Sequence, residues 1–317
     1  MKKKITIIEE TGAAGEVTAQ AVKVLDAVAE QYDHYFDLIH TAETTPQPAG
    51  DATLFSGTAT QRTIENAFPV LVTVQPVTVY PSLQHLSPLK PKHSEGLNLL
   101  LYQAQTTDAH NQDRITQSAL QQAANRKKQI TVVTHPQDPE QASWLEVLEK
   151  AGRDYKDIRL EQIAVQEAWD RMLQQPAGFD VIITHKAAGD YLFSQAAAIT
   201  GTRFMIPAVR VAGAMPFFSP AFAFDQQPES ARNLSNPVGA ILSIAMMMDY
   251  FNLHEEALII RTAVNWTLLH GFVAKDMDSV NNYSTSTIGD LISDFIRGTI
   301  PGFAKGENMA LQKSTII

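Results

Sequence analysis

Residues 179–190 read FDVIITHKAAGD, an apolar strand pattern that passes directly into a helix pattern. Such a run, bounded by a glycine before it and a short loop after it, is typical of a strand buried on both faces. Open parallel sheets bind ligands where such a strand gives way to a helix. His185, Lys186 and Asp190 therefore form the first candidate site, with two basic groups and a carboxylate for an anionic ligand. The alternative is a structural one, in which Asp190 favours a helix N-terminus beside a solvated Lys186.

The alternation of strands and helices continues on both sides of this stretch. Strands are predicted at residues 4–8, 52–56, 69–74, 97–102, 130–134 and 158–164. Helices are predicted at residues 15–32, 113–128, 140–150, 168–173, 190–200, 255–269 and 286–296, the last with Thr285 or Ser286 as N-cap. A further helix is predicted behind Asn236 as N-cap and Pro237 at its first position. Between residues 76 and 91 the prolines predict an irregular crossover. The order predicts an α/β fold with a largely parallel sheet flanked by helices.

Composition excludes several classes of protein. The chain has 317 residues and no cysteine, so it can form neither disulfides nor Cys-ligated zinc or iron–sulfur sites. The net charge of −9 disfavours non-specific nucleic-acid binding. The apolar run after the N-terminal lysines covers only residues 5–8, too short for a signal peptide, and residues 238–248 are too few to cross a bilayer. We expect a soluble cytoplasmic protein with no membrane or nucleic-acid partner.

General motifs give little chemistry. The chain contains no Walker A sequence, no G-x-G-x-x-G, no H-E-x-x-H and no G-x-S-x-G elbow. Gly12 and Gly15 after the first strand weakly resemble a dinucleotide turn. A turn that needs a positive φ before a helix is the preferred interpretation of these glycines.

Several stretches together resemble the isocitrate/isopropylmalate dehydrogenase family, the metal-dependent β-decarboxylating dehydrogenases, and most of all the isopropylmalate dehydrogenases. They are residues 5–8, 15–17, 22–28, 79–81, 179–184, 189–190, 199–201, 234–243 and 284–290. The resemblance implies a two-domain isopropylmalate dehydrogenase-like fold. Its first, discontinuous domain would comprise residues 1–84 and 205–317, and its second, residues 85–204, would carry a dimer interface.

The catalytic residues of that family do not carry over. The resemblance implies NAD(P), a divalent Mg or Mn ion held by three aspartates, a lysine and a tyrosine for proton transfer, and arginines that grip substrate carboxylates. By position the arginines correspond to Gln75, Thr78 and Tyr102, and the lysine to His135. The tyrosine segment is missing between residues 105 and 113.

The metal and cofactor residues are also replaced. Of the metal aspartates only Asp190 remains, its partner one helical turn on is Ser194, and the aspartate of a second subunit corresponds to Gln166. The nucleotide loop is replaced by residues 223–227, the acidic glycine turn by residues 11–14, and Asn236 is the one vestige of the cofactor site.

These losses predict an inactive protein. A missing general acid or base costs roughly 10²–10⁴-fold in rate, and Mg²⁺ dehydrates reluctantly and is normally held through carboxylates together with substrate. We therefore expect no cofactor, and a binding or regulatory role. The former cleft would be lined by residues that leave room for a small anionic ligand: Glu16, Gln75, Thr78, Tyr102, His135, His185, Lys186 and Asp190.

Two other functions remain open. One is an NAD-dependent oxidoreductase that acts on a malate-type 2-hydroxy acid through a rebuilt metal site. The other is a metal-free lyase or hydrolase that uses His135 or His185 as base.

A homodimer is expected from the family's four-helix interface. Apolar surface for it would come from two helices: Trp144, Leu145 and Leu148, with Leu192, Phe193, Ala196 and Ile199. The alternative is a monomer that buries these side chains internally.

Overall fold

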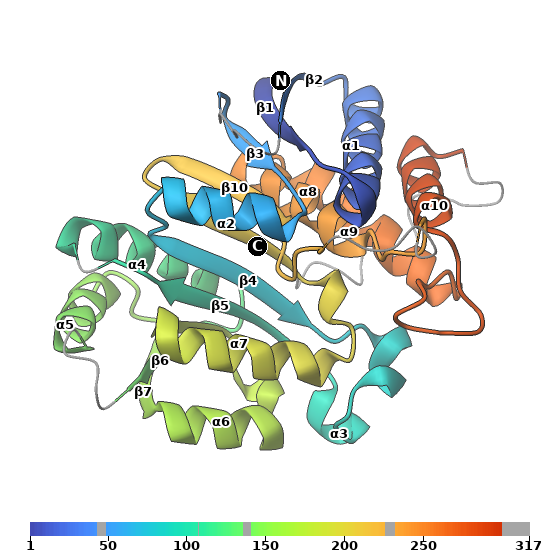
Figure 1. Cartoon of the computed structure of the whole chain (residues 1–317). Coiled ribbons are helices and arrows are strands. Elements are labelled where there is room, and N and C mark those ends of the chain that lie inside the picture. Colours follow the sequence, from blue (N-terminus) through green and yellow to red (C-terminus); the bar gives the residue numbers. More distant parts are fainter. Residues whose placement is uncertain (43–48, 107, 136–140, 226–231, 300–317) are drawn as a thin grey trace. The chain divides into compact units, whose positions relative to one another are not determined.

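The computed structural model divides the chain into two compact units (Figure 1). It describes residues 1–42, 49–106, 108–135, 141–225 and 232–299. The outer unit comprises Met1–Pro69 and the chain from Phe204 onward, and the middle unit comprises Val70–Arg203. The middle unit begins ahead of residue 85 because the strand around residue 75 pairs with its neighbour at residue 101. The domain limits expected from the sequence stay a prediction.

In its described part, the outer unit contains five strands in the order β2-β1-β3-β10-β9. They are β1 (Lys2–Glu9), β2 (Tyr35–Ala42), β3 (Ala52–Leu54), β9 (Pro207–Ala212) and β10 (Met215–Pro220). β1 is parallel to β2 and β3, and β3 is parallel to β10, whereas β9 and β10 are antiparallel. The predicted largely parallel sheet is thereby confirmed for this unit. Sequence patterns missed β2, none of whose side chains is fully buried, and β9 and β10, which contain the prolines that usually argue against strands.

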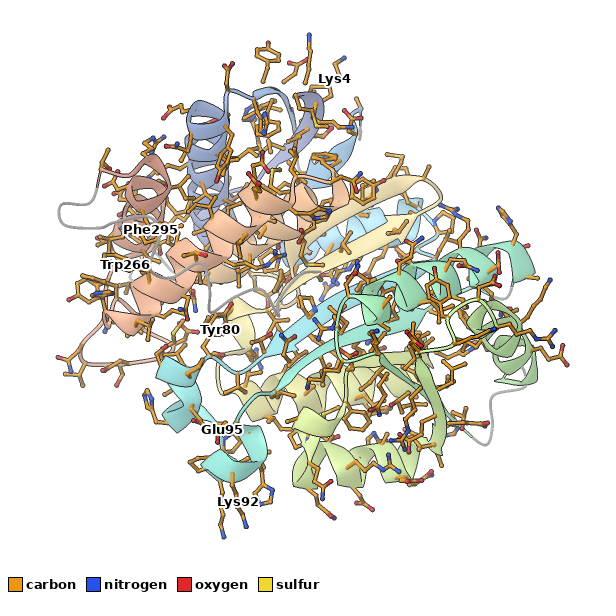
Figure 2. The ribbon with its side chains drawn as sticks, turned by 180° about the vertical axis from the view of Figure 1, so that it is seen from behind. Lys4, Tyr80, Lys92, Glu95, Trp266 and Phe295 are labelled. Carbon is orange, nitrogen blue, oxygen red and sulfur yellow. The ribbon has the colours of Figure 1, made fainter. Side chains whose placement is uncertain are left out.

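Helices surround these strands. They are α1 (Gly12–Tyr32), α2 (Thr58–Ala67), α8 (Val238–Tyr250), α9 (His254–Leu269) and α10 (Thr285–Arg297), with the short 3₁₀ turn η3 (Arg203–Met205) at the return from the middle unit. α1 packs against α8 and α10, and α8 packs against α9 and β10. Trp266 of α9 lies on Phe295 of α10 with ring centroids 5.5 Å apart (Figure 2). Among the described helices, none is long and apolar enough to span a membrane.

Two predicted helix N-caps are wrong by one or two residues. α8 begins at Val238, with Pro237 in the capping position, and the side-chain oxygen of Asn236 accepts the Val238 amide at 3.0 Å. α10 is capped by Ser284, whose hydroxyl accepts the Thr287 amide at 3.1 Å. For α10 the adjacent residues 284–286 are all hydroxyl residues that can cap, and Ser284 is the one whose side chain does so.

The middle unit contains β4 (Val72–Thr78), β5 (Asn98–Ala104), β6 (Gln129–Thr134), β7 (Arg159–Ala164) and β8 (Val181–His185). Their order is β4-β5-β8-β6-β7, with β4 antiparallel to β5 and the remaining pairs parallel. The expected irregular crossover between residues 76 and 91 is wrong. Pro76 lies within β4, and Pro81 and Pro91 open the short helices η1 (Pro81–Leu86) and α3 (Pro91–Ser94), because proline fits the first turn of a helix.

Among the described residues, the longer helices of the middle unit cover its strands. They are α4 (Ala109–Ala124), α5 (Gln141–Gly152), α6 (Val165–Gln174) and α7 (Lys186–Thr200), with the 3₁₀ turn η2 (Pro176–Gly178) after α6. α4 packs on α5, α6 packs on α7, and α7 lies against β4 and β5 (Figure 1). The approach of α7 to β5 requires glycine at position 189, because a Cβ there would lie 2.6 Å from the Gln103 Cγ.

The side chains expected to supply a dimer interface are buried within the chain itself. This holds for Trp144, Leu148, Leu192, Phe193, Ala196 and Ile199, while the Leu145 side chain lies outside the described part. The exposed large apolar side chains of α6 and α7 are instead Trp169, Leu173 and Tyr191, at 37%, 50% and 68%. The expected interface residues are therefore wrong, because α5 and α7 use those side chains as core.

Candidate functional site

The candidate site at the start of α7 is open to solvent. α7 begins at Lys186, four residues before the predicted start, so Asp190 lies in the second turn. The Lys186 ammonium is 3.9 Å from the Asp190 carboxylate, and both side chains are more than half exposed. Ser194 donates its hydroxyl to the backbone carbonyl of Asp190 at 2.8 Å. The Asp190 carboxylate thus has a cation and no second carboxylate beside it on α7.

His185 ends β8 and caps α7, and its ring has a different neighbour from Lys186. It packs edge-on against the buried indole of Trp144, with centroids 5.9 Å apart and an interplanar angle of 85°. Because His185 contacts α5 while Lys186 pairs along α7, the two basic groups do not form one anion clamp.

The strand register separates Tyr102 from Gln75. In the β4–β5 pair, Val74 lies opposite Tyr102 and Thr73 lies opposite Gln103. Opposed residues share a face and neighbours along a strand alternate, so Gln75 shares its face with Gln103 and not with Tyr102. The phenol of Tyr102 points to α4, where it is 3.3 Å from the Ser118 hydroxyl. Burial raises the pKa of Tyr102 to about 12.

Gln103 is a candidate residue that the sequence reasoning missed. It is buried, and its side chain lies under Gly189 of α7. Counting alternate positions outward from the pair that includes Gln75 would have selected it over Tyr102. That count needs the register of β4 on β5, which the sequence pattern did not provide.

The remaining expected residues of the middle unit lie at opposite ends of its parallel strands. His135 directly follows β6 and His185 ends β8, so the two histidines lie at the carboxyl ends of parallel strands. Thr78 pairs with Asn98, the first residue of β5, and so lies at the other end. Among the expected residues of the middle unit, the structure therefore brings the two histidines to the same end of the strands and places Thr78 at the other end.

The donor set does not fit a divalent metal ion. Within the described ranges, no group of three or more His, Asp or Glu side chains could hold one. Asp190 has Lys186 and Ser194 as its helical neighbours, and Gln166 is exposed on α6. Magnesium and manganese prefer several carboxylate oxygens, which these positions do not supply.

In the outer unit, a carboxylate of the chain occupies the N-terminus of α2. Glu10 follows β1, and its side chain accepts the amides of Ser56 and Gly57 at 2.6 and 2.7 Å and the Thr60 hydroxyl at 2.6 Å. Exposed amides at a helix N-terminus bind phosphates and other anions. Here Glu10 uses the two amides that directly precede the helix, and the Thr58 amide donates to the Phe224 carbonyl at 3.1 Å.

The segments expected at a nucleotide site are also tied to the fold. The amide of Phe224 donates to the Ser56 carbonyl at 2.8 Å, and its ring stacks on Phe204 at 5.6 Å. The Asn236 amide donates to Asp276 at 3.2 Å; burial raises the pKa of that carboxyl, and this hydrogen bond opposes the rise.

Glu16, another expected lining residue, is engaged as well. Its carboxylate accepts the Asn233 amide at 2.8 Å and lies 3.9 Å from the Arg232 guanidinium. Gln226 and Gln227 lie outside the described residues.

Comparisons with known proteins agree with this fold. Residues 102–292 match the family model for isocitrate/isopropylmalate dehydrogenase. The 3-isopropylmalate dehydrogenase of Priestia megaterium is 27% identical, with 89% of this chain and 92% of the relative covered. That of Thermotoga maritima is 30% identical over 69% of each chain. Isocitrate dehydrogenase from Methylococcus capsulatus superposes with a TM-score of 0.72 at 19% identity, covering 93% of this chain and 99% of that one. On the match of its own sequence to the family model, the chain belongs to the isocitrate/isopropylmalate dehydrogenase family.

Proposed function

We propose that this protein is a catalytically inactive member of its family that acts by binding, in a regulatory or other non-catalytic role. The observation that carries the proposal is the environment of Asp190. Its carboxylate lies beside Lys186, and Ser194 stands where the helix would need a second carboxylate. A single, solvent-exposed carboxylate cannot offset the dehydration of Mg²⁺.

The substrate side supports the same conclusion. Uncharged Gln75, Thr78 and Tyr102 occupy the positions where the resemblance implies arginines that hold carboxylates. A charge-assisted hydrogen bond from an arginine to a carboxylate is worth about 1.5–3 kcal/mol, and an uncharged side chain does not supply it. These replacements remove the side chains that would bind the substrate carboxylates. Together with the poor metal site, they leave the family reaction without substrate binding and without a metal ion to polarise the substrate.

The segments expected to bind a dinucleotide cofactor support the proposed inactivity independently. A dinucleotide presents two negative phosphates, which bind where backbone amides are exposed. At the N-terminus of α2 the Glu10 carboxylate uses two amides, and its own charge repels a phosphate. The vestigial Asn236 is engaged as donor to Asp276 and as acceptor for the α8 amide of Val238.

The test is a melting and activity panel. We expect NAD⁺, NADP⁺, Mg²⁺, Mn²⁺ and 2-hydroxy diacids, alone and combined, to leave the melting temperature unchanged, and NADH absorbance to stay flat with malate-type substrates. The 3-isopropylmalate dehydrogenase of Thermotoga maritima, run in parallel, serves as the positive control. A metal-dependent rise in melting temperature with NAD⁺ that Asp190→Asn abolishes contradicts the proposal, as does turnover with any substrate in the panel.

We further propose that the protein forms a homodimer through α6 and α7. Trp169 and Tyr191, one from each helix, contact edge to face at 6.1 Å and are exposed, as is Leu173 one turn after Trp169. A patch of exposed aromatic side chains on adjacent helices is typical of a protein interface. This patch replaces the buried residues expected from the sequence.

A further inference from the structure

The middle unit contains a cavity at the amino ends of its parallel strands. His185 lies at the opposite, carboxyl ends of these strands. The cavity has a volume of about 430 Å³ and lies between the first residues of β6 and β7, the end of α6 and the turn η2. The strands contribute Gln129, Arg159 and Glu161. His185 ends a parallel strand, whereas Gln129 and Arg159 begin theirs, so the cavity is separate from the candidate site above.

We propose that this cavity binds a small anionic metabolite whose carboxylate or phosphate is held by Arg159. Gln129 lies directly opposite Arg159 in the parallel pair, and Glu161 follows two residues later on the same face. The backbone amide of Arg159 donates a hydrogen bond to the Lys128 carbonyl at 2.9 Å. Its guanidinium forms no ion pair with any carboxylate in the described ranges.

The other charged side chains at the cavity belong to one ion-pair network. Arg171 of α6 pairs with Glu161 at 2.8 Å and with Glu167 at 2.6 Å. These pairs raise the pKa of Arg171, chiefly through the hydrogen bond with Glu161. Glu161 also receives the Gln129 amide at 3.4 Å. Both glutamates are thus engaged with Arg171, and exposed Arg159 is the cation that forms no ion pair among the described residues that line the cavity.

The lining fits an anion with further polar groups. A guanidinium presents a planar fork of donors that matches the two oxygens of a carboxylate or phosphate. The side-chain amides of Gln174 and Gln175 add donors and acceptors to the lining, and Phe179 adds an apolar ring. The volume lies within the range of small-molecule sites. Because the chain carries a net charge of −9, general electrostatic attraction does not draw anions to it, and binding depends on this local cation.

The experiment titrates malonate and inorganic phosphate separately into the full-length protein, with ligand-observed NMR and melting temperature as readouts. Wild type should bind at least one probe saturably. Arg159→Gln should weaken that binding about tenfold or more, and Arg159→Lys should fall between the two because it keeps the charge without the fork. Arg62→Gln, the same charge change on exposed Arg62 of α2, controls for net charge and should behave as wild type.

Each outcome decides something. Saturable binding of malonate alone indicates that the ligand carries a carboxylate. Saturable binding of phosphate alone indicates a phosphate ester. Binding of both probes indicates a site that recognises the anionic chemistry they share. No saturable binding of either probe, or equal binding by wild type and Arg159→Gln, overturns the proposal. The result is independent of the proposed inactivity, since neither probe needs turnover, metal or nucleotide.

Discussion

The Glu10 carboxylate accepts the backbone amide of Gly57 at 2.7 Å, so an acidic side chain from the end of β1 closes the N-terminus of α2. The neighbouring amide of Ser56 and the hydroxyl of Thr60 donate to the same carboxylate. A helix N-terminus favours negative charge, and hydrogen bonds to a charged acceptor are stronger than neutral ones. This arrangement both fixes α2 and removes an anion-binding site.

Replacing Glu10 by glutamine should lower the free energy of unfolding by about 1–3 kcal/mol, because the charge-assisted bonds become neutral and one oxygen becomes a donor that faces other donors. Urea denaturation measures the change. Glu9→Gln is the matched control, since the Glu9 side chain is 66% exposed, and it should change stability by less than about 0.5 kcal/mol. Equal effects of the two substitutions would contradict the role given to Glu10.

The buried pair of Arg126 and Asp180 should be far more important for stability than an exposed pair nearby. Arg126 donates to Asp180 at 2.8 Å and to the carbonyl and side-chain oxygens of Asn98, each at 2.8 Å. Asp180→Asn should cost about 3–5 kcal/mol, because it leaves a buried guanidinium uncompensated. Asp157→Asn, which breaks the exposed pair with Lys128, should cost at most about 1 kcal/mol. Chemical denaturation of both variants checks the contrast.

Tyr102 should make stability fall at alkaline pH. Burial raises its pKa from 10.0 to about 12, so the folded protein holds the proton that the unfolded chain releases first. Its contribution to the free energy of unfolding is complete below pH 10 and is lost as the pH rises towards 12. A pKa difference of about two units between the folded and unfolded protein corresponds to about 2–3 kcal/mol. Tyr102→Phe should flatten the stability profile in that window and remove one phenol from the late part of the tyrosinate absorbance titration. An unchanged titration would show that the phenol is accessible.

Charge on the α6–α7 patch should prevent dimer formation. Trp169→Glu combined with Tyr191→Glu should convert the proposed dimer into a monomer, because it places like charges in the interface. Sedimentation equilibrium gives the mass. Val280→Glu, at another exposed apolar residue, should leave the mass of a dimer unchanged. A wild-type protein that sediments as a monomer at high concentration contradicts the dimer.

Much of the fold could be predicted from the sequence because its helices and buried strands have strong periodic patterns. α1 and α9 agree with their predicted ranges to within a few residues at each end, as does β6. α2 was missed because its described side chains bury only Thr60 and Ile64, which leaves almost no apolar stripe. β9 and β10 were missed because prolines occur in both, and their pairing is specified by partners distant in sequence.

The candidate site could be predicted only in part. Sequence spacing correctly placed His185 and Lys186 at a strand–helix junction. It could not show that their side chains have different neighbours, nor that Gln103 and not Tyr102 shares a face with Gln75. Those facts depend on register and packing. The cavity at Arg159 gave no signal, because its residues come from four elements with no common motif.

The path of the chain through the outer unit has a consequence for synthesis on the ribosome. β3 pairs with β1 on one side and with β10 on the other, yet β10 follows β3 only after the whole middle unit has been made. Residues 70–203 are contiguous and can fold as they emerge, whereas β3 waits with an open edge that favours aggregation. Nascent chains halted near residue 203 should therefore depend on chaperones that shield the first 69 residues.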